Sequence, residues 1–148
     1  MSEWRRNLID SPEAIARILA ETRRIAVLGI KTEAQRGKPA FYVPEYMARA
    51  GYDIVPVPVY YPEVTSILGR PVYRSLAAIP DRIDMVNVFR RPPAIPPHLP
   101  DILAARPRVV WLQLGIAHDE VAETLARAGI EVVQDRCILV EHRRVGPQ

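Results

Sequence analysis

Positively charged side chains gather in two short segments of the sequence, each of which follows an apolar run. They are Lys31, Arg36 and Lys38 after residues 25–30, and Arg90 and Arg91 after residues 85–89. Lys and Arg are the side chains that bind phosphate groups, and Arg often does so through two parallel hydrogen bonds. Glu33 is the acidic residue near them in sequence. Brought together by the fold, the two segments would form a site for a ligand that carries several phosphates.

A single glycine precedes the first basic segment and separates it from the common nucleotide-binding loops. The dinucleotide fingerprint Gly-x-Gly-x-x-Gly needs three glycines, but residues 29–34 contain only Gly29. No Gly-Lys-Ser/Thr follows, so the segment is not a phosphate-binding P-loop. Gly29 taken alone is therefore weak evidence for a nucleotide site.

The apolar run that follows this segment ends at residues 55–58 without an acidic residue. NAD sites usually place Asp or Glu at this point to hold the ribose hydroxyls. The backbone at Pro56 and Val57 suits an adenine ring and leaves the ribose unclamped, so a 3′-phosphorylated adenosine fits better than NAD. An equally good interpretation is that Pro56 and Pro58 only end a strand near the sheet edge.

Few residues have the types and spacing of a catalytic group. There is no Gly-x-Ser-x-Gly motif, and one cysteine with three scattered histidines does not make a zinc-ligand pattern. Cys137 follows the last apolar run, where it either reacts or packs as an inert apolar side chain. His118 is expected at the start of a helix, and a structural role is favoured for it.

Short apolar runs alternate with segments of helical periodicity along the chain. Strands buried on both faces are predicted at residues 25–30, 52–57, 85–89, 109–114 and 130–133. Helices are predicted from Pro12 to near Arg23 and around residues 41–50, 95–103 and 121–128. Pro44 either kinks the second helix or lies in its first turn. A weaker strand at 71–73, a short helix capped by Ser75 and a frayed end at 143–148 complete the prediction.

Strands that alternate with helices predict an α/β fold. We expect a doubly wound, mostly parallel sheet of about five to six strands with helices on both faces. In the strand order 3-2-1-4-5-6, ligands bind beyond the carboxyl ends of the strands, between the first and the fourth. The loop after Gly29 should then face the loop after Phe89, which brings the two basic segments together.

The composition is that of one globular domain. The chain has 148 residues, of which 49% are hydrophobic and 25% charged, and one cysteine, so disorder and a disulfide scaffold are excluded. It contains no run of about 18 apolar residues and no apolar signal segment near Met1, so we predict a cytoplasmic protein without a membrane partner. The net charge of +3 gives a pI near 9.3, which leaves nucleic-acid binding as an alternative.

Three strings of this sequence resemble the small bacterial and archaeal CoA-binding proteins. They are Asp-Met-Val-Asn-Val-Phe-Arg-Arg-Pro at 84–92, Val-Trp-Leu-Gln-Leu-Gly-Ile at 110–116 and Asp-Arg-Cys at 135–137. The resemblance covers about residues 25–142 and implies a single Rossmann-like CoA-binding domain over residues 1–148. That domain is similar to the N-terminal domain of the succinyl-CoA synthetase alpha subunit. One departure is Lys31, which stands where the family more often has Ser.

The resemblance implies coenzyme A or an acyl-CoA bound across the sheet. The implied contacts are Gly29, Ile30, Lys31, Arg36 and Lys38 for the phosphates, Pro56 and Val57 for the adenosine, Phe89, Arg90 and Arg91 for the pyrophosphate or pantetheine, Gln113 and Leu114 for the pantetheine end, and Cys137 near the thiol. The synthetase's catalytic machinery lies in other domains, and its phosphorylated histidine has no counterpart here. We therefore expect a CoA carrier or regulator without catalysis of its own.

Two other functions remain open at this point. One is a small acyl-CoA or nucleotide-dependent enzyme that uses Cys137 or His118 as its reactive group. The other is a nucleic-acid-binding module, which the high pI suggests. The small charge excess and the absence of a long basic run favour the first expectation, with no nucleic-acid partner. The sequence does not identify an acyl group, a protein partner or an oligomeric state.

Overall fold

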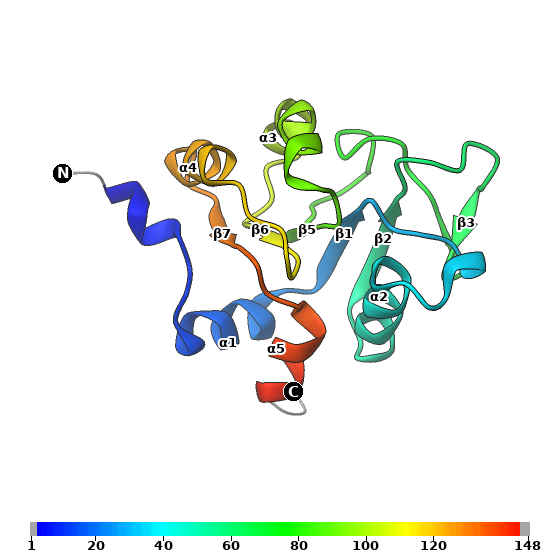
Figure 1. Cartoon of the computed structure of the whole chain (residues 1–148), viewed down its shortest axis with the longest axis horizontal. Coiled ribbons are helices and arrows are strands. Elements are labelled where there is room, and N and C mark those ends of the chain that lie inside the picture. Colours follow the sequence, from blue (N-terminus) through cyan, green and yellow to red (C-terminus); the bar gives the residue numbers. More distant parts are fainter. Residues whose placement is uncertain (1–2, 146–148) are drawn as a thin grey trace.

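The computed structural model describes residues 3–145, in which a parallel sheet lies between two layers of helices (Figure 1). The helices of one layer are α3 (Leu99–Ala105) and α4 (Asp119–Arg127), and those of the other are α1 (Pro12–Glu21), α2 (Pro39–Arg49) and α5 (Ile138–Val145). Short 3₁₀ turns are η1 (Glu3–Asn7), η2 (Glu33–Gln35), η3 (Pro92–Ala94) and η4 (Pro96–His98). This arrangement confirms the predicted α/β fold.

The sheet has five strands, and all of its neighbours pair in parallel. The strands are β1 (Arg24–Leu28), β2 (Asp53–Val57), β5 (Met85–Val88), β6 (Val109–Leu112) and β7 (Glu131–Val133). Their spatial order is β2-β1-β5-β6-β7, so the direction of winding reverses between β1 and β5. Ligands bind at such a reversal in open α/β sheets, which places the candidate site beyond Leu28 and Val88.

Alternate residues of each strand point into two separate cores. In β1, Ala26 and Leu28 belong to the core that contains Ile102 of α3, and all three side chains are buried. Ile25 belongs to the opposite core with Phe41 of α2. Burial of a Leu, Ile or Val side chain contributes about 1.5–3 kcal/mol, so both faces of the sheet stabilise the fold.

The segment after β2 differs from the prediction. The expected strand at 71–73 is instead a small antiparallel hairpin of β3 (Ser66–Ile67) and β4 (Arg70–Pro71), outside the main sheet. One hydrogen bond from the Tyr73 amide to the Pro56 carbonyl (3.0 Å) attaches the hairpin to β2. The helix expected at Ser75 is only a turn, in which the Ser75 hydroxyl accepts from the Ala78 amide.

The end of the chain also differs from the prediction. Residues 143–145 are not frayed but form the last turn of α5, while 146–148 lie outside the described residues. The buried Glu141 of this helix pairs with Arg136 (3.6 Å) and Arg144 (3.2 Å). The packing of the buried Ile138 holds the helix against the sheet, and the ion pairs neutralise the buried Glu141.

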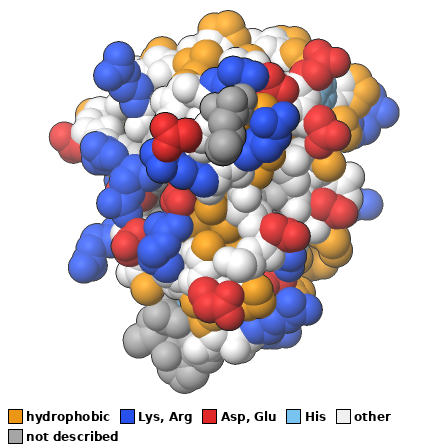
Figure 2. Space-filling view, turned by 90° about the vertical axis from the view of Figure 1, so that its left-hand side faces the viewer, with side chains coloured by type: hydrophobic (Ala, Val, Ile, Leu, Met, Phe, Trp, Pro, Cys, Tyr) orange, Lys and Arg blue, Asp and Glu red, His pale blue; other side chains and the backbone are white. Residues whose placement is uncertain are grey.

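The N-terminal segment packs beside β7 at the sheet edge. The Ile9 amide donates to the Val132 carbonyl (2.9 Å), and Asn7 Nδ2 donates to the Ala126 carbonyl of α4 (2.9 Å). Figure 2 shows this side of the molecule, where Lys and Arg side chains gather toward one margin with carboxylates among them. The segment therefore protects an edge strand that has only three residues of its own.

Candidate functional site

The loops after β1 and β5 are in direct contact at Gly29. Gly29 has φ +90°, and a Cβ there would overlap the Phe89 carbonyl oxygen and lie 3.3 Å from Cδ of Arg90. Its amide donates to the Val57 carbonyl (2.9 Å), while the Phe89 amide donates to the Leu28 carbonyl (2.9 Å). Only glycine combines this backbone conformation with this approach. The two basic segments thus meet at the reversal point.

Pro44 lies inside α2, and its position is explained by the neighbouring loop. Proline has no amide hydrogen, so the Ala40 carbonyl, four residues earlier, receives no helical hydrogen bond from it. That carbonyl instead accepts from the Lys31 amide (3.0 Å). Pro44 therefore leaves free the acceptor that fixes the backbone at the start of the basic loop.

A hollow of about 70 Å³ lies where the loops meet. Its lining comprises Gly29, Ile30, Lys31, Ala40, Val59, Tyr60, Tyr61, Phe89 and Arg90. A wider, shallower hollow of about 650 Å³ continues from it along Val59, Tyr60 and Tyr61 to Arg74. The combined surface is a cleft with an apolar and aromatic wall and cationic side chains at its inner end.

Arg90 is held across this cleft by two side chains. Its Nε donates to Nε2 of His98 (3.2 Å), and its Nη1 lies 3.5 Å from the Tyr60 hydroxyl, with the guanidinium 5.7 Å from the Tyr60 ring centre. The hydrogen bond and charge of Arg90 lower the pKa of Tyr60, with help from Arg91 and Lys31. Burial and the charge of Arg90 lower the pKa of His98. Neutral His98 is thus the hydrogen-bond acceptor that orients Arg90.

The two tyrosines of the cleft stand on a loop that Arg74 organises. The Arg74 guanidinium donates to the carbonyls of Tyr60 (3.1 Å), Tyr61 (2.9 Å) and Val64 (2.7 Å). Tyr61 has φ 65°, which is unusual for a tyrosine and needs such support. Its hydroxyl lies 3.5 Å from Nζ of Lys31, so the loop and the basic segment contact each other.

The other predicted phosphate ligands lie at the rim. Lys38 is exposed just before α2, and Arg91 is exposed just before η3. Arg36 lies 3.9 Å from the Glu45 carboxylate and 5.7 Å from the Phe41 ring centre. None of these three lines the inner hollow.

Pro56 and Val57 are buried in β2 rather than exposed to a ligand. The segment that follows β2, from Val59 to Tyr61, lines the cleft instead. These three residues, Arg74 and His98 were not predicted as site residues. Two consecutive tyrosines after a strand that ends in proline were the available sequence signal.

The residues predicted for the pantetheine end lie beyond β6. Gln113 is buried, and its Oε1 accepts from Nδ2 of Asn87 (3.3 Å) and from the Ile138 amide (3.3 Å). It therefore joins β5, β6 and the start of α5. Leu114 is 65% exposed and does not line the inner hollow.

Cys137 lies directly before α5 and is half-buried. Its carbonyl accepts from the Glu141 amide (3.0 Å), and its side chain packs against the core beneath α5. Asp135 precedes it with φ 57°, and its carboxylate accepts from the Gly115 amide (2.7 Å). The loops after β6 and β7 are thus fastened together. His118 caps α4, because its Nδ1 accepts from the Val121 amide (3.2 Å).

A five-stranded parallel sheet with its cationic cleft at the strand reversal defines a Rossmann-like class of domain. The sequence also matches the model of the CoA-binding domain family over residues 23–143. The chain belongs to that family, which confirms the resemblance noted in the sequence.

Individual relatives agree with this assignment. The chain is 36% identical over 132 residues to the uncharacterized protein YneT of Bacillus subtilis (strain 168). The aligned region covers 89% of this chain and 94% of YneT. A solved Thermus thermophilus structure is 39% identical, with a TM-score of 0.84 over 92% of this chain and 99% of the other.

A third similarity shows the fold alone. A dinucleotide-forming acetyl-coenzyme A synthetase of Ca. Korarchaeum cryptofilum, in complex with phosphate and ADP, superposes with a TM-score of 0.61 at 15% identity. The match covers 74% of this chain and 25% of the synthetase. Within residues 3–145, no helix is long and apolar enough to cross a membrane.

Proposed function

We propose that the protein binds coenzyme A or an acyl-CoA as a single domain, in the cleft beyond the carboxyl ends of β1 and β5. The observation that carries the proposal is the contact of the Gly29 loop with Arg90 at the strand reversal, inside a chain of the CoA-binding domain family. Lys31 and Arg90 line the inner hollow, where they would contact the pyrophosphate. Lys38 and Arg91 at the rim would meet further phosphate oxygens as the ligand enters.

The adenosine is proposed to lie against the end of β2. The exposed ring of Tyr60 and the side chain of Val59 offer an apolar wall beside the cations. Pro56 and Val57 support this wall from beneath, because both are buried. No carboxylate ends β2, so the 3′-phosphate of CoA meets no repulsion there.

The pantetheine arm is proposed to cross the ends of β5 and β6 toward Leu114 and Cys137. Parallel strands lie about 4.8 Å apart, so three intervals from β1 to β7 span about 14 Å. An extended pantetheine arm covers such a distance. The exposed Leu114 side chain would then be covered by the ligand.

A carrier or regulatory role fits these residues better than catalysis. The Nδ1 atom of His118 accepts a helix amide, and Oε1 of Gln113 is taken by two donors. Nδ1 of His118 is therefore used as a helix cap and is not free for acid–base chemistry, while Gln113 has a structural role. Cys137 is half-buried, with its carbonyl in the first turn of α5 and its side chain packed against the core.

Calorimetric titration with CoA tests the proposal in the wild type and in Arg90→Gln. Loss of one charge-assisted contact weakens binding by about 1.5–3 kcal/mol, or roughly tenfold to hundredfold. Arg49→Gln is the matched control, because Arg49 is exposed on α2 and pairs only with Glu45 (3.5 Å) among the described residues. We expect the control to bind like the wild type. Equal CoA affinity in all three proteins would contradict the proposed site.

A further inference from the structure

A second, larger hollow lies at the opposite edge of the sheet from the CoA cleft. Its volume is about 740 Å³, and its walls are the segments that lead into β5, β6 and β7 together with Asn7. Sites for small molecules have volumes of about 300–1,000 Å³, so this hollow is large enough for one.

Three arginines line this amino-edge hollow: Arg82, Arg106 and Arg108. Among residues 3–145, Arg82 and Arg106 form no ion pair. Arg108 donates to the Glu21 carbonyl (3.3 Å) and reaches the Glu21 carboxylate only at 3.9 Å. The hollow therefore has three guanidinium groups with little local neutralisation.

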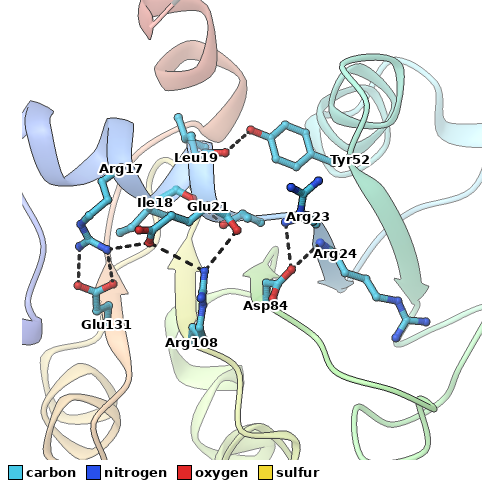
Figure 3. A network of polar contacts seen from close by, with 11 residues as sticks. Arg17, Ile18, Leu19, Glu21, Arg23, Arg24, Tyr52, Asp84, Arg108 and Glu131 are labelled. Carbon is cyan, nitrogen blue, oxygen red and sulfur yellow. Dashed lines mark hydrogen bonds and ion pairs between the residues drawn. The ribbon is translucent and has the colours of Figure 1, made fainter. Parts of the chain in front are cut away.

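The carboxylates at this edge already have hydrogen-bond or ion-pair partners (Figure 3). Glu131, the acidic residue on the lining, accepts two hydrogen bonds from Arg17 (2.7 and 3.4 Å). Asp84 accepts from the backbone amides of Arg23 (3.0 Å) and Arg24 (2.9 Å). Glu131 is thus paired with Arg17, so Arg82 and Arg106 keep no ion pair among residues 3–145, and Arg108 has only its 3.9 Å contact with Glu21.

Arg106 adds an independent observation from the backbone. It ends α3 in the left-handed conformation, with φ 51° and ψ 54°, and Pro107 follows it. Helix ends of this kind usually carry Gly or Asn, and the residue before proline is restricted further. A bulky residue is unfavourable here, so the presence of Arg suggests a use for its side chain.

We propose that the amino-edge hollow binds a small ligand with two or more phosphate or carboxylate groups. Arginine suits this task because its planar fork donates two parallel hydrogen bonds to either group. Asn7 would add a polar contact at the wall, where its Nδ2 already donates to Ala126. The ligand class is distinct from the adenosine and pantetheine of the CoA cleft, because the lining has no aromatic side chain.

A structural role for Arg106 predicts a different behaviour. The carboxyl ends of α3 and α4 both border the hollow, and cationic side chains are favourable near helix carboxyl ends. In that role, Arg106→Gly would lose a favourable charge interaction. Glycine relieves the left-handed backbone in either role, so a ligand-binding role predicts a melting temperature about 2–4 °C higher with no offsetting loss, together with weaker ligand binding.

Amide NMR with inorganic pyrophosphate as the probe separates the two ends of the molecule. Gly129 lines the amino-edge hollow, and Gly29 lines the CoA cleft, so their amide signals report binding at each place. We expect a saturable shift at Gly129 in the wild type and in Arg49→Gln. Arg106→Gln should weaken it about tenfold or more.

Two results would overturn the proposal. One is a shift confined to Gly29, or a Gly129 response that Arg106→Gln and Arg82→Gln leave unchanged. The other is an Arg106→Gly variant that melts below the wild type and binds pyrophosphate equally well. A repeat of the titration with citrate, a tricarboxylate, shows whether carboxylate groups are accepted as phosphates are; binding of neither probe also refutes the site.

Discussion

Replacement of Gly29 by alanine perturbs the contact on which the proposed CoA site depends. The left-handed conformation (φ +90°) costs an alanine about 1–2 kcal/mol. The new Cβ also overlaps the Phe89 carbonyl oxygen, and overpacking of this kind costs about 1–3 kcal/mol. We therefore expect the free energy of unfolding to fall by about 2–5 kcal/mol.

Gly129→Ala is the matched control for this substitution. Gly129 has φ +86°, but a Cβ there meets nothing within 4 Å. Only the conformational cost applies, so the free energy of unfolding should fall by about 1–2 kcal/mol. The difference between the two variants isolates the contact between the loops after β1 and β5.

Urea unfolding and CoA calorimetry of the two variants give the required numbers. Gly29→Ala should also weaken CoA binding by about tenfold or more, because Cδ of Arg90 lies 3.3 Å from the added Cβ and must shift. Gly129→Ala should bind CoA like the wild type. Equal destabilisation of both variants, with unchanged CoA affinity in Gly29→Ala, would refute the reasoning.

Three further variants or treatments test other parts of the site. Pro44→Ala restores an amide that competes with Lys31 for the Ala40 carbonyl, so CoA affinity should fall severalfold with unchanged helix content by circular dichroism; unchanged affinity would contradict this. Burial lowers the pKa of His98 below the ordinary histidine value of about 6.5, so the unfolded chain gains this proton first as the pH falls. The free energy of unfolding should then decline below about pH 6.5, less steeply in His98→Gln, and identical pH profiles would exclude the effect. CoA disulfide should form a 1:1 mixed disulfide with Cys137 and release CoA thiol; modification seen only after unfolding would leave Cys137 as a packing residue.

The strands were predictable because strands buried on both faces appear in the sequence as short, nearly continuous apolar runs. Runs such as Met85–Val88 and Val109–Leu112 are buried at every position and are apolar except at Asn87, as two-sided burial favours. The reversal point followed from the order of strands and helices. The contact of Gly29 with Phe89 then brought the predicted basic loops together.

The errors arose where particular backbone and side-chain pairings, rather than hydrophobic periodicity, decide the structure. The segment near Pro71 is too short to join the sheet and folds back on Ser66 as a hairpin. The last helix was missed because Glu141 looks solvent-exposed in the sequence, whereas its ion pairs allow it to be buried. Pro44 was ambiguous, because its partner carbonyl is used by Lys31 from another segment.

The candidate site was only partly predictable for the same reason. Gln113 was expected beside the pantetheine, and its side-chain Oε1 accepts hydrogen bonds from Asn87 and from the first amide of α5. Its proposed ligand contact remains a prediction. Tyr60 was missed, because its place in the site depends on contacts with residues distant in sequence. Arg90 contacts its ring across the cleft, and Arg74 donates to its carbonyl.

Side-by-side calorimetry of the wild-type protein with CoA, acetyl-CoA, dephospho-CoA, NAD and ATP tests the central claim most directly. The cationic cleft and the absence of a carboxylate at the end of β2 predict the tightest binding for CoA or acetyl-CoA. Removal of the 3′-phosphate should weaken binding by about 1.5–3 kcal/mol if that group meets a basic side chain. NAD or ATP binding as tightly as CoA, or no heat with CoA at all, would contradict the account.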